Sequence, residues 1–303
     1  MAVAAHNYSE PTLLRPDSFP MRLYEKAKRL GVWNPADLDF SQDRQDWEEM
    51  NAERRKAILR LTTRFMAGEE AVTIDLLPLV LAIARQGRLE EEIFLTTFLF
   101  EEAKHTDFFN RWLREVAGSP RLPRAPEPTI HLFDVELPKV MNALLEDQSP
   151  VAMARASVTY NMVIEGVLAE TGYHNYHQSL AVNGLMPGLC AGLVNIKRDE
   201  SRHIAYGVYL LSRLVAEDEA VWPAIEERME ELRPLMEEII RSGYEAYPDG
   251  VSPFGLRGAD FTEFAARQFR KRYERIAKAR RSTLAEIDAA SEPAEVEDLL
   301  AEV

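Results

Sequence analysis

The sequence predicts an all-α fold, a bundle of long helices, and three observations support that prediction. Over long segments, apolar residues recur at spacings of three and four, which is typical of amphipathic helices. Only 14 of the 303 residues are glycine, and the alternation of β-branched and polar residues that indicates strands is nearly absent. No linker divides the chain, so we expect one domain over residues 1–303, with an ordered core at about 20–289, a flexible N-terminus and an acidic, mobile C-terminal tail.

The predicted helices follow one another along most of the chain. The first begins after the acidic stretch DRQDWEEM, and the second stops at the Gly-Ser-Pro sequence 118–120. The stretch SPRLPRAPEPT (119–129) holds four prolines and is expected to be a loop. With approximate bounds, the predicted helices are 51–85, 89–116, 137–146, 150–180, 187–215, 221–247 and 261–289.

Composition narrows the classes of function. A 46% hydrophobic and 28% charged chain is typical of a globular protein with a sizeable core, and the net charge of −14 argues against nucleic-acid or anionic-membrane binding. The single cysteine, Cys190, leaves no partner for an intrachain disulfide. We identify no signal peptide, and the longest apolar run (75–84) is too short for a transmembrane segment. A cytoplasmic protein is therefore expected.

A pattern of glutamate and histidine occurs twice. FLFEEAKHTDFF (98–109) and NIKRDESRHIAYGV (195–208) each place a glutamate three residues before a histidine, and each has another glutamate 33 or 35 residues upstream in an apolar segment. A spacing of three leaves two side chains about 60° apart on an α-helix, so each pair shares a face. The six residues of the pattern are Glu69, Glu102, His105, Glu165, Glu200 and His203.

Four carboxylates and two imidazoles facing one bundle predict a dinuclear metal site. This is the ligand set of ferritin-like di-iron and di-manganese proteins, and carboxylate oxygens suit iron or manganese better than zinc. One Glu-x-x-His alone is usually a surface pair. Two such pairs in apolar segments favour metal, because four buried carboxylates without cations would be strongly destabilising.

Neighbouring residues are alternative ligands. Glu70 and Glu101 adjoin Glu69 and Glu102, and the repeated spacing of three selects Glu102 over Glu101. The remaining histidines fit no such pattern and are expected on the surface or in the core; they are His6, His131, His174 and His177.

Over most of residues 20–245 the chain resembles the ribonucleotide-reductase small-subunit superfamily within the ferritin-like proteins. The segments WNPADLDFSQDRQDW (33–47) and RDESRH (198–203) carry this resemblance together with the metal pattern. It implies a four-helix dimetal core with additional helices. It also implies that Asp199 hydrogen-bonds and orients the ligand His105, with Trp33 as the partner of Asp199 further out. For Trp33, an ordinary core aromatic is the alternative.

One position departs from typical reductase subunits. They generally carry a radical-storing tyrosine four residues after the first ligand histidine, where this chain has Phe109. A subgroup of reductase subunits also has phenylalanine there and uses a manganese/iron pair. The chain is more similar to the ligand-binding oxidases of the same superfamily, which hold a mixed manganese/iron site and a long-chain fatty acid whose carboxylate reaches the metals. In those oxidases a valine three residues after the first glutamate ligand becomes joined to a tyrosine, and Val72 and Tyr160 match these positions.

Without the resemblance, Val72 and Tyr160 would be ordinary core residues. On a regular α-helix, a spacing of five places Tyr160 about 140° away from Glu165. A π-bulge in this segment would bring both side chains to the metals.

We therefore expect an oxygen-activating oxidase with a manganese/iron site, or a di-iron one, a bound long-chain fatty acid and a Val72–Tyr160 ether cross-link. A reductase radical subunit of the phenylalanine type is the first alternative, although the tail EVEDLLAEV lacks the aromatic residue that would carry a radical. A ferritin-like metal store or scaffold is the second, and the Trp33 and Asp199 elements argue against it.

The expected partners are dioxygen, a long-chain fatty acid or similar apolar carboxylate, and a second copy of the chain in a homodimer. Residues near the ligands are candidates for lining an acyl tunnel, with ordinary core packing as the alternative. These candidates are Phe98, Phe108, Met162, Val163, Leu168 and Ala169.

Overall fold

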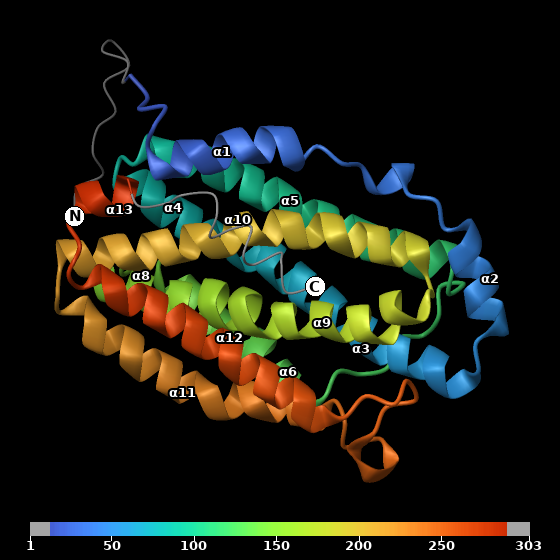
Figure 1. Cartoon of the computed structure of the whole chain (residues 1–303). Helices are drawn as coiled ribbons and strands as arrows, with labels where there is room; N and C mark the ends of the chain where they lie inside the picture. Colours follow the sequence, from blue (N-terminus) through green and yellow to red (C-terminus); the bar gives the residue numbers. More distant parts are fainter. Residues whose placement is uncertain (1–12, 290–303) are drawn as a thin grey trace.

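The structure is a computed structural model that describes residues 13–289, and it confirms the all-α prediction (Figure 1). Within this range the β-type pairing consists of one antiparallel bridge between Val251 and Arg257. The α-helices are α1 (Phe19–Leu30), α2 (Ser41–Glu49), α3 (Ala52–Asp75), α4 (Leu77–Arg85), α5 (Leu89–Glu115), α6 (Glu127–His131), α7 (Leu137–Ala143), α8 (Pro150–Ser157), α9 (Glu170–Ser179), α10 (Pro187–Glu217), α11 (Val221–Ser242), α12 (Gly258–Ala279) and α13 (Leu284–Ala289). Two π-helices, η2 (Leu132–Glu136) and η3 (Val158–Ala169), and three short 3₁₀ turns, η1 (Pro35–Asp37), η4 (Ala181–Asn183) and η5 (Pro248–Gly250), complete the list.

Four long helical stretches form the core of the bundle. They are α3, α5, α10 and the continuous run of α8, η3 and α9, and each contacts its neighbours in the group. Helix α1 covers α5 and α10 on one side, while α11 and α12 cover η3 on the opposite side (Figure 1). The bundle core is therefore shielded on two sides by further helices.

The predicted helix bounds were wrong at two breaks. The predicted helix 51–85 is two helices, because Pro78 lies in the first turn of α4, where a proline ring is tolerated and an i−4 hydrogen bond is not needed. The predicted helix 261–289 is likewise divided by a break between α12 and α13. By contrast, α5 and α10 agree with the predicted segments within two residues.

Other differences lie near the proline-rich loop and at the N-terminal end. The loop ends three residues earlier than predicted, since α6 begins at Glu127. Helices α1 and α2 were not predicted, although α1 buries an apolar face that includes Phe19, Leu23 and Ala27. The predicted flexible segment before residue 13 and the acidic tail from residue 290 lie outside the described residues.

Two apolar clusters lie on either side of the glutamate–histidine residues along α3, α5 and α10. The cluster members next to the ligands are Phe65, Phe108 and Ile196 in one cluster and Val72, Phe98 and Tyr206 in the other. Water is thereby excluded above and below the polar centre, which strengthens electrostatic interactions inside it.

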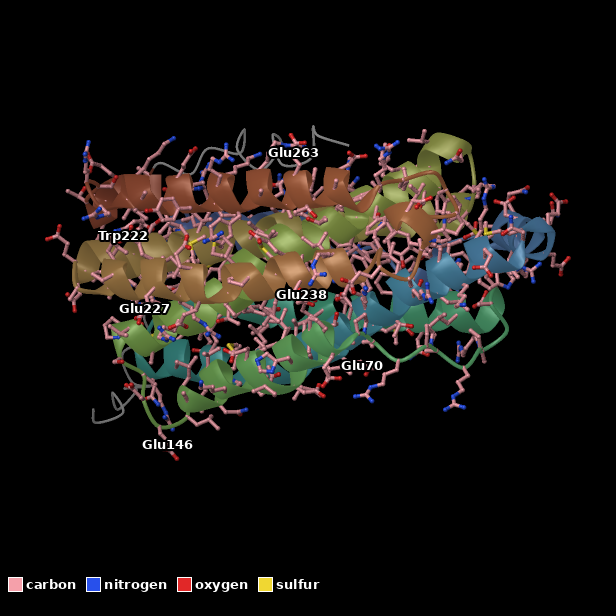
Figure 2. The ribbon with its side chains drawn as sticks, turned by 90° about the horizontal axis from the view of Figure 1, so that it is seen from below. Glu70, Glu146, Trp222, Glu227, Glu238 and Glu263 are labelled. Atoms are coloured by element: carbon pink, nitrogen blue, oxygen red, sulfur yellow. The ribbon has the colours of Figure 1, made fainter. Side chains whose placement is uncertain are left out.

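The outward face of the bundle carries acidic side chains that contribute to the net charge. Glu227 on α11 and Glu263 on α12 are exposed, and Glu238 on α11 is partly exposed; Figure 2 labels all three. Over residues 13–289, every helix is too short or too polar to span a lipid bilayer.

Candidate metal centre

The structure brings all six glutamates and histidines of the repeated pattern into one buried cluster. One group of ligand atoms comes from Glu69, Glu102, His105 and Glu200, and a second from Glu102, Glu165, Glu200 and His203; within each group the atoms lie within 4.8 Å of one another. Because Glu102 and Glu200 belong to both groups, their carboxylates lie between two adjacent cation positions. The cluster can therefore hold a dinuclear metal site.

His105 turns one ring nitrogen towards the cluster and the other away from it. Its Nδ1 lies 3.4 Å from Oε2 of Glu69 and 3.5 Å from Oε1 of Glu200. Its Nε2 lies 3.2 Å from Oδ2 of Asp199, and the indole Nε1 of Trp33 donates to the same oxygen at 2.8 Å. The order Trp33–Asp199–His105 thus fixes the ring and directs Nδ1 to the cation position.

His203 has the equivalent orientation. Its Nδ1 lies 2.9 Å from Oε1 of Glu102, 3.4 Å from Oε2 of Glu200 and 3.7 Å from Oε1 of Glu165. Its Nε2 lies 2.9 Å from Oε2 of Glu101. Glu101 therefore orients the second histidine and is not a member of either ligand group.

Unsatisfied polar atoms test whether this cluster fits metal ions. Buried atoms without a hydrogen-bond partner in residues 13–289 include Oε1 of Glu102, Nδ1 of His105, Oε1 of Glu165, Oε2 of Glu200 and Nδ1 of His203. Each of these atoms points into the cluster, and leaving so many buried acceptors unpaired in one place would be strongly destabilising. Two cations would satisfy all of them, so the residues present fit a dimetal group.

The electrostatics of the cluster agree with a cation site. Burial raises the pKa of Glu69 to about 8, and burial together with the Glu200 carboxylate raises the pKa of Glu165 well above its ordinary value. Although burial opposes their charge, the surrounding carboxylates raise the pKa values of His105 and His203 well above the ordinary value. Without cations, the site would hold protons in their place.

The residues next to these glutamates and histidines also form a sequence repeat. Side chains of each repeat contact side chains of the other repeat. The sequences EEAKH (101–105) and DESRH (199–203) both read acid, glutamate, any residue, base, histidine. The leading acid of each repeat contacts the histidine of the other, as given above. The bases follow the same rule: Lys104 Nζ lies 3.0 Å from Oδ2 of Asp199, and Arg202 Nη2 lies 2.5 Å from Oε1 of Glu101.

Sequence reasoning missed three side chains that hold the ligands. Glu101 was considered as a rival ligand, although its place in the five-residue repeat was a visible signal for its actual position. Asn161 Nδ2 donates to Oε2 of Glu165 at 3.0 Å, and the Tyr173 hydroxyl donates to Oε1 of Glu200 at 3.2 Å. The Tyr173 contact depends on how α9 and α10 face one another, which no local spacing indicates, whereas Asn161 lies four residues before Glu165 in the same helical segment.

The residues that were weighed as alternatives, or that lie next to the predicted ligands, differ in how far they are buried. Glu70 is exposed and labelled at the molecular surface in Figure 2, whereas Glu69 is 5% exposed and lies in the cluster. Phe109 is fully buried and stacks on Phe65 with ring centroids 5.5 Å apart. Of the remaining histidines in the described residues, His131 is exposed, and His174 and His177 are partly buried.

Val72 and Tyr160 belong to the same buried apolar cluster beside the clustered glutamates and histidines. Tyr160 lies in the π-helix η3, and its ring stacks on Phe98 with centroids 5.8 Å apart. Its hydroxyl is buried without a hydrogen-bond partner in residues 13–289, and burial, followed by the Glu102 and Glu165 carboxylates, raises its pKa well above the ordinary value. In a π-helix the hydrogen bonds run from residue i to residue i+5, so two residues that are five apart lie about one turn apart. Tyr160 and Glu165 therefore share a face of η3.

A cavity of about 120 Å³ opens from the cluster between α3, η3, α9 and α11, well above the ~15 Å³ that one water molecule needs. Glu69, Glu102, Glu165 and Glu200 form one end of it. Apolar side chains line the rest, and they include Val72, Phe133, Leu168, Ala169, Ile239 and Ile240.

The predicted tunnel lining was partly wrong. Leu168 and Ala169 line this cavity, whereas the other four candidates lie elsewhere in the core; these are Phe98, Phe108, Met162 and Val163. Phe98 instead stacks on the His203 ring, with centroids 3.6 Å apart. The cavity wall contains α11 residues that are distant in sequence, which no local pattern indicates.

Comparison with known proteins places this geometry in a family. The model of the ribonucleotide reductase small chain matches residues 20–265. An R2-like ligand-binding oxidase with an aerobically reconstituted Mn/Fe cofactor is 38% identical, with a TM-score of 0.85, over 89% of this chain and 98% of that chain. A valine-to-alanine variant of an R2-like ligand-binding oxidase, with an anaerobically reconstituted Mn/Fe cofactor, is 40% identical, with a TM-score of 0.81, over 86% of this chain and 94% of that chain.

These matches confirm the resemblance that the metal pattern and the two flanking segments predicted. They extend over the bundle core and over the covering helices α1 and α11. The chain therefore belongs to the ribonucleotide reductase small-chain family, and within it to the R2-like ligand-binding oxidases.

Proposed function

We propose that this protein is an oxygen-activating oxidase that holds manganese and iron, binds a long-chain fatty acid and forms an ether cross-link between Val72 and Tyr160. The observation that supports it most is the set of unpartnered carboxylate and imidazole atoms directed into one buried cluster, which adjoins an apolar cavity. The Mn/Fe cofactors of the similar oxidases support the identity of the metals.

In this proposal the six clustered residues hold the metals, with Glu69 and His105 at one position, Glu165 and His203 at the other, and the two remaining glutamates shared. When bound, the metal pair supplies the power to reduce dioxygen and to oxidise an unactivated C–H bond. Asp199 and Glu101 keep the two imidazoles in the tautomer that presents Nδ1 to the metals.

The ligand proposal rests on the shape and polarity of the cavity. Its apolar walls suit an alkyl chain, and its inner end lies among the carboxylates that would hold the cations, where a fatty-acid carboxylate would complete their coordination. Val72 lies on the same wall as Glu69, one turn along α3, so its side chain faces the place where the oxidant would form.

The cross-link would join a side-chain carbon of Val72 to the phenol oxygen of Tyr160. One hydrogen leaves each residue, so two protons and two electrons pass to dioxygen while one C–O bond forms. Burial and the nearby Glu102 and Glu165 carboxylates keep the phenol of Tyr160 protonated until then, since all of them raise its pKa. A hydroxyl with no hydrogen-bond partner is also free to react.

Peptide mapping tests this function directly. Protein loaded with reduced manganese and iron is exposed to oxygen, digested with trypsin and analysed by mass spectrometry. We expect the peptides that contain Val72 and Tyr160 to be joined, with a mass about two daltons below their sum. Separate, unmodified peptides from fully loaded and oxidised protein would contradict the oxidase proposal and favour the reductase alternative, for which Phe109 would rule out a tyrosyl radical at that position.

Two further parts of the proposal concern assembly and location. A homodimer remains our prediction, and apolar side chains exposed on α3 and α4, at Ile74, Leu77 and Leu81, are consistent with it. Light scattering at micromolar concentration distinguishes a dimer from a monomer or from the large shell that a storage protein would form. A cytoplasmic location also remains a prediction.

A further inference from the structure

The wall of the apolar cavity contains one cationic side chain away from the metal ligands. Arg64 on α3 lines this cavity and also a second, outer pocket that contains Arg60 and Tyr247, so its guanidinium lies at the junction of the two. The outer pocket is lined by no aspartate or glutamate from the described part of the chain. Arg64 therefore meets no carboxylate among the residues that line the outer pocket, and the glutamates of the inner cavity belong to its metal end.

Contacts around Arg64 show how little the protein satisfies it. Its Nε is buried without a hydrogen-bond partner, and no carboxylate oxygen of residues 13–289 lies within 4.0 Å of its guanidinium nitrogens. Burial lowers the Arg64 pKa, which the nearby Tyr244 and Tyr247 oppose and Arg60 reinforces. A buried guanidinium N–H without a partner is a costly feature in an apolar wall.

The fold nevertheless fixes the position of this side chain. A Cβ built on Gly243 would lie 2.5 Å from Nη1 of Arg64, so the guanidinium packs against a site that only glycine leaves open. Gly243 caps the C-terminal end of α11, where the helix dipole favours a cation. Tyr244, next in sequence, lines both cavities and is held by a hydrogen bond from Asn175.

Because the metal end and Arg64 are on the same helix, their separation is set by α3. Arg64 and Glu69 are five residues apart on α3, which is about 7.5 Å of helix rise and about 140° of rotation, and both line the cavity. A ligand whose first carboxylate lies at the metals can reach Arg64 with its far end.

We propose that Arg64 is a specificity-determining residue that binds a second anionic group at the far end of the ligand. The inference rests on the proposed function and narrows its ligand class from long-chain monocarboxylic acids to aliphatic acids with an acidic group at each end. A carboxylate there accepts two parallel N–H bonds from the guanidinium, which is the geometry that arginine provides and lysine does not.

Ligand competition on metal-loaded protein tests the inference. Saturated monocarboxylic acids and the dicarboxylic acids of the same carbon number, over a series of chain lengths, displace a fluorescent fatty-acid probe. At the chain length that spans the cavity, we expect the dicarboxylic acid to bind at least about tenfold more tightly, as one charge-assisted hydrogen-bonded pair would give. Arg64→Met should remove this preference while the affinity for the monocarboxylic acid changes by no more than about twofold.

Two further variants separate position from charge. Arg64→Lys keeps the charge but not the paired donors, so part of the preference should remain. Gly243→Ala keeps Arg64 but displaces its guanidinium, and it should reduce the preference without altering metal content, even if Arg64→Met fails to fold.

Equal affinity for both acids at every chain length, or a preference that survives in Arg64→Met, would overturn the inference and leave the oxidase proposal intact. Failure of both acids to displace the probe from metal-loaded protein would overturn the proposed fatty-acid ligand itself, and the inference with it.

Discussion

Glu101 and Glu102 are adjacent in sequence yet contact opposite nitrogens of the same imidazole: Oε2 of Glu101 lies 2.9 Å from Nε2 of His203, and Oε1 of Glu102 lies 2.9 Å from Nδ1. Consecutive residues on α5 therefore have different tasks. Glu102 faces the cation positions. Glu101 contacts the histidine nitrogen that points away from the cluster, and Arg202 neutralises the Glu101 carboxylate. Asp199 and Glu200 divide the same two tasks with respect to His105.

Removing one ligand from each repeat should empty the site. In Glu102→Ala with His203→Ala, we expect retention of two metals per chain to be lost, because both cation positions lose a ligand, while the helical circular-dichroism spectrum persists. Elemental analysis after gel filtration measures this. Glu70→Ala with His131→Ala is the matched control, since both residues are exposed, and it should retain both metals. Two metals in the first variant would refute the assignment.

Weakening the support of His203 should lower metal affinity without changing stoichiometry. Glu101→Gln replaces the charged acceptor for Nε2 with a neutral amide, and loss of such support typically costs about 10–100-fold in affinity. Competition with a chelator of known affinity gives the value. Glu115→Gln, at a partly exposed position of α5, is the control. An unchanged affinity in Glu101→Gln would show that the contact does not position the ligand.

The free energy of unfolding of the metal-free protein should fall as pH rises. In the metal-free fold the pKa values of Glu69, Glu165, His105 and His203 are raised above their ordinary values, so the folded state holds protons that the unfolded chain releases. Stability from these groups is present at low pH and is lost as pH rises, for Glu69 between about 4.5 and about 8.

In metal-loaded protein, cations replace these protons. We therefore expect the difference in free energy of unfolding between metal-loaded and metal-free protein to widen as pH rises from about 5 to about 8. Urea denaturation of both forms across this range measures it. A difference that narrows with rising pH would mean that the clustered groups are not the ones that bind the cations.

Loss of the Tyr160 hydroxyl should separate cross-linking from metal binding. Tyr160→Phe keeps the ring that stacks on Phe98 but removes the oxygen that the link requires, so the cross-link should be absent and two metals should remain. Intact mass and elemental analysis of the same sample give both results. A cross-linked product in this variant would identify a different residue as the acceptor.

The lipid content of purified protein should follow its metal content. Because the inner end of the cavity is formed by the four carboxylates, a fatty acid there requires the cations to offset repulsion. We expect a near-stoichiometric long-chain acid in a denaturing organic extract of metal-loaded protein and less in metal-free protein. Only trace lipid in the loaded protein would count against the ligand proposal.

Much of the site could be read from the sequence because its residues repeat at helical spacing. The doubled Glu-x-x-His selects Glu102 and Glu200 correctly as members of the cluster, and the fold class follows from the same long periodic segments. The break at Pro78 was missed since apolar periodicity continues on both sides of it.

The cavity could not be predicted in the same way. Ile239 and Ile240 line the cavity from α11, about 70 residues beyond Leu168 in the sequence. The position of the Arg64 guanidinium likewise depends on its packing against Gly243, which is distant in sequence. Such contacts depend on how helices cross, and no local spacing encodes them.

The π-helix η3 has a consequence for comparing relatives. In η3, two residues that are five apart lie on one face, as two residues that are four apart do on an α-helix. Tyr160 and Glu165 therefore share a face although the segment between them is one residue longer. A homologue with a plain α-helix and tyrosine four residues before its glutamate would present the same pair. An alignment that forbids gaps inside helices would pair Tyr160 with the wrong residue of such a homologue, and evolutionary gain or loss of the phenol would be misread.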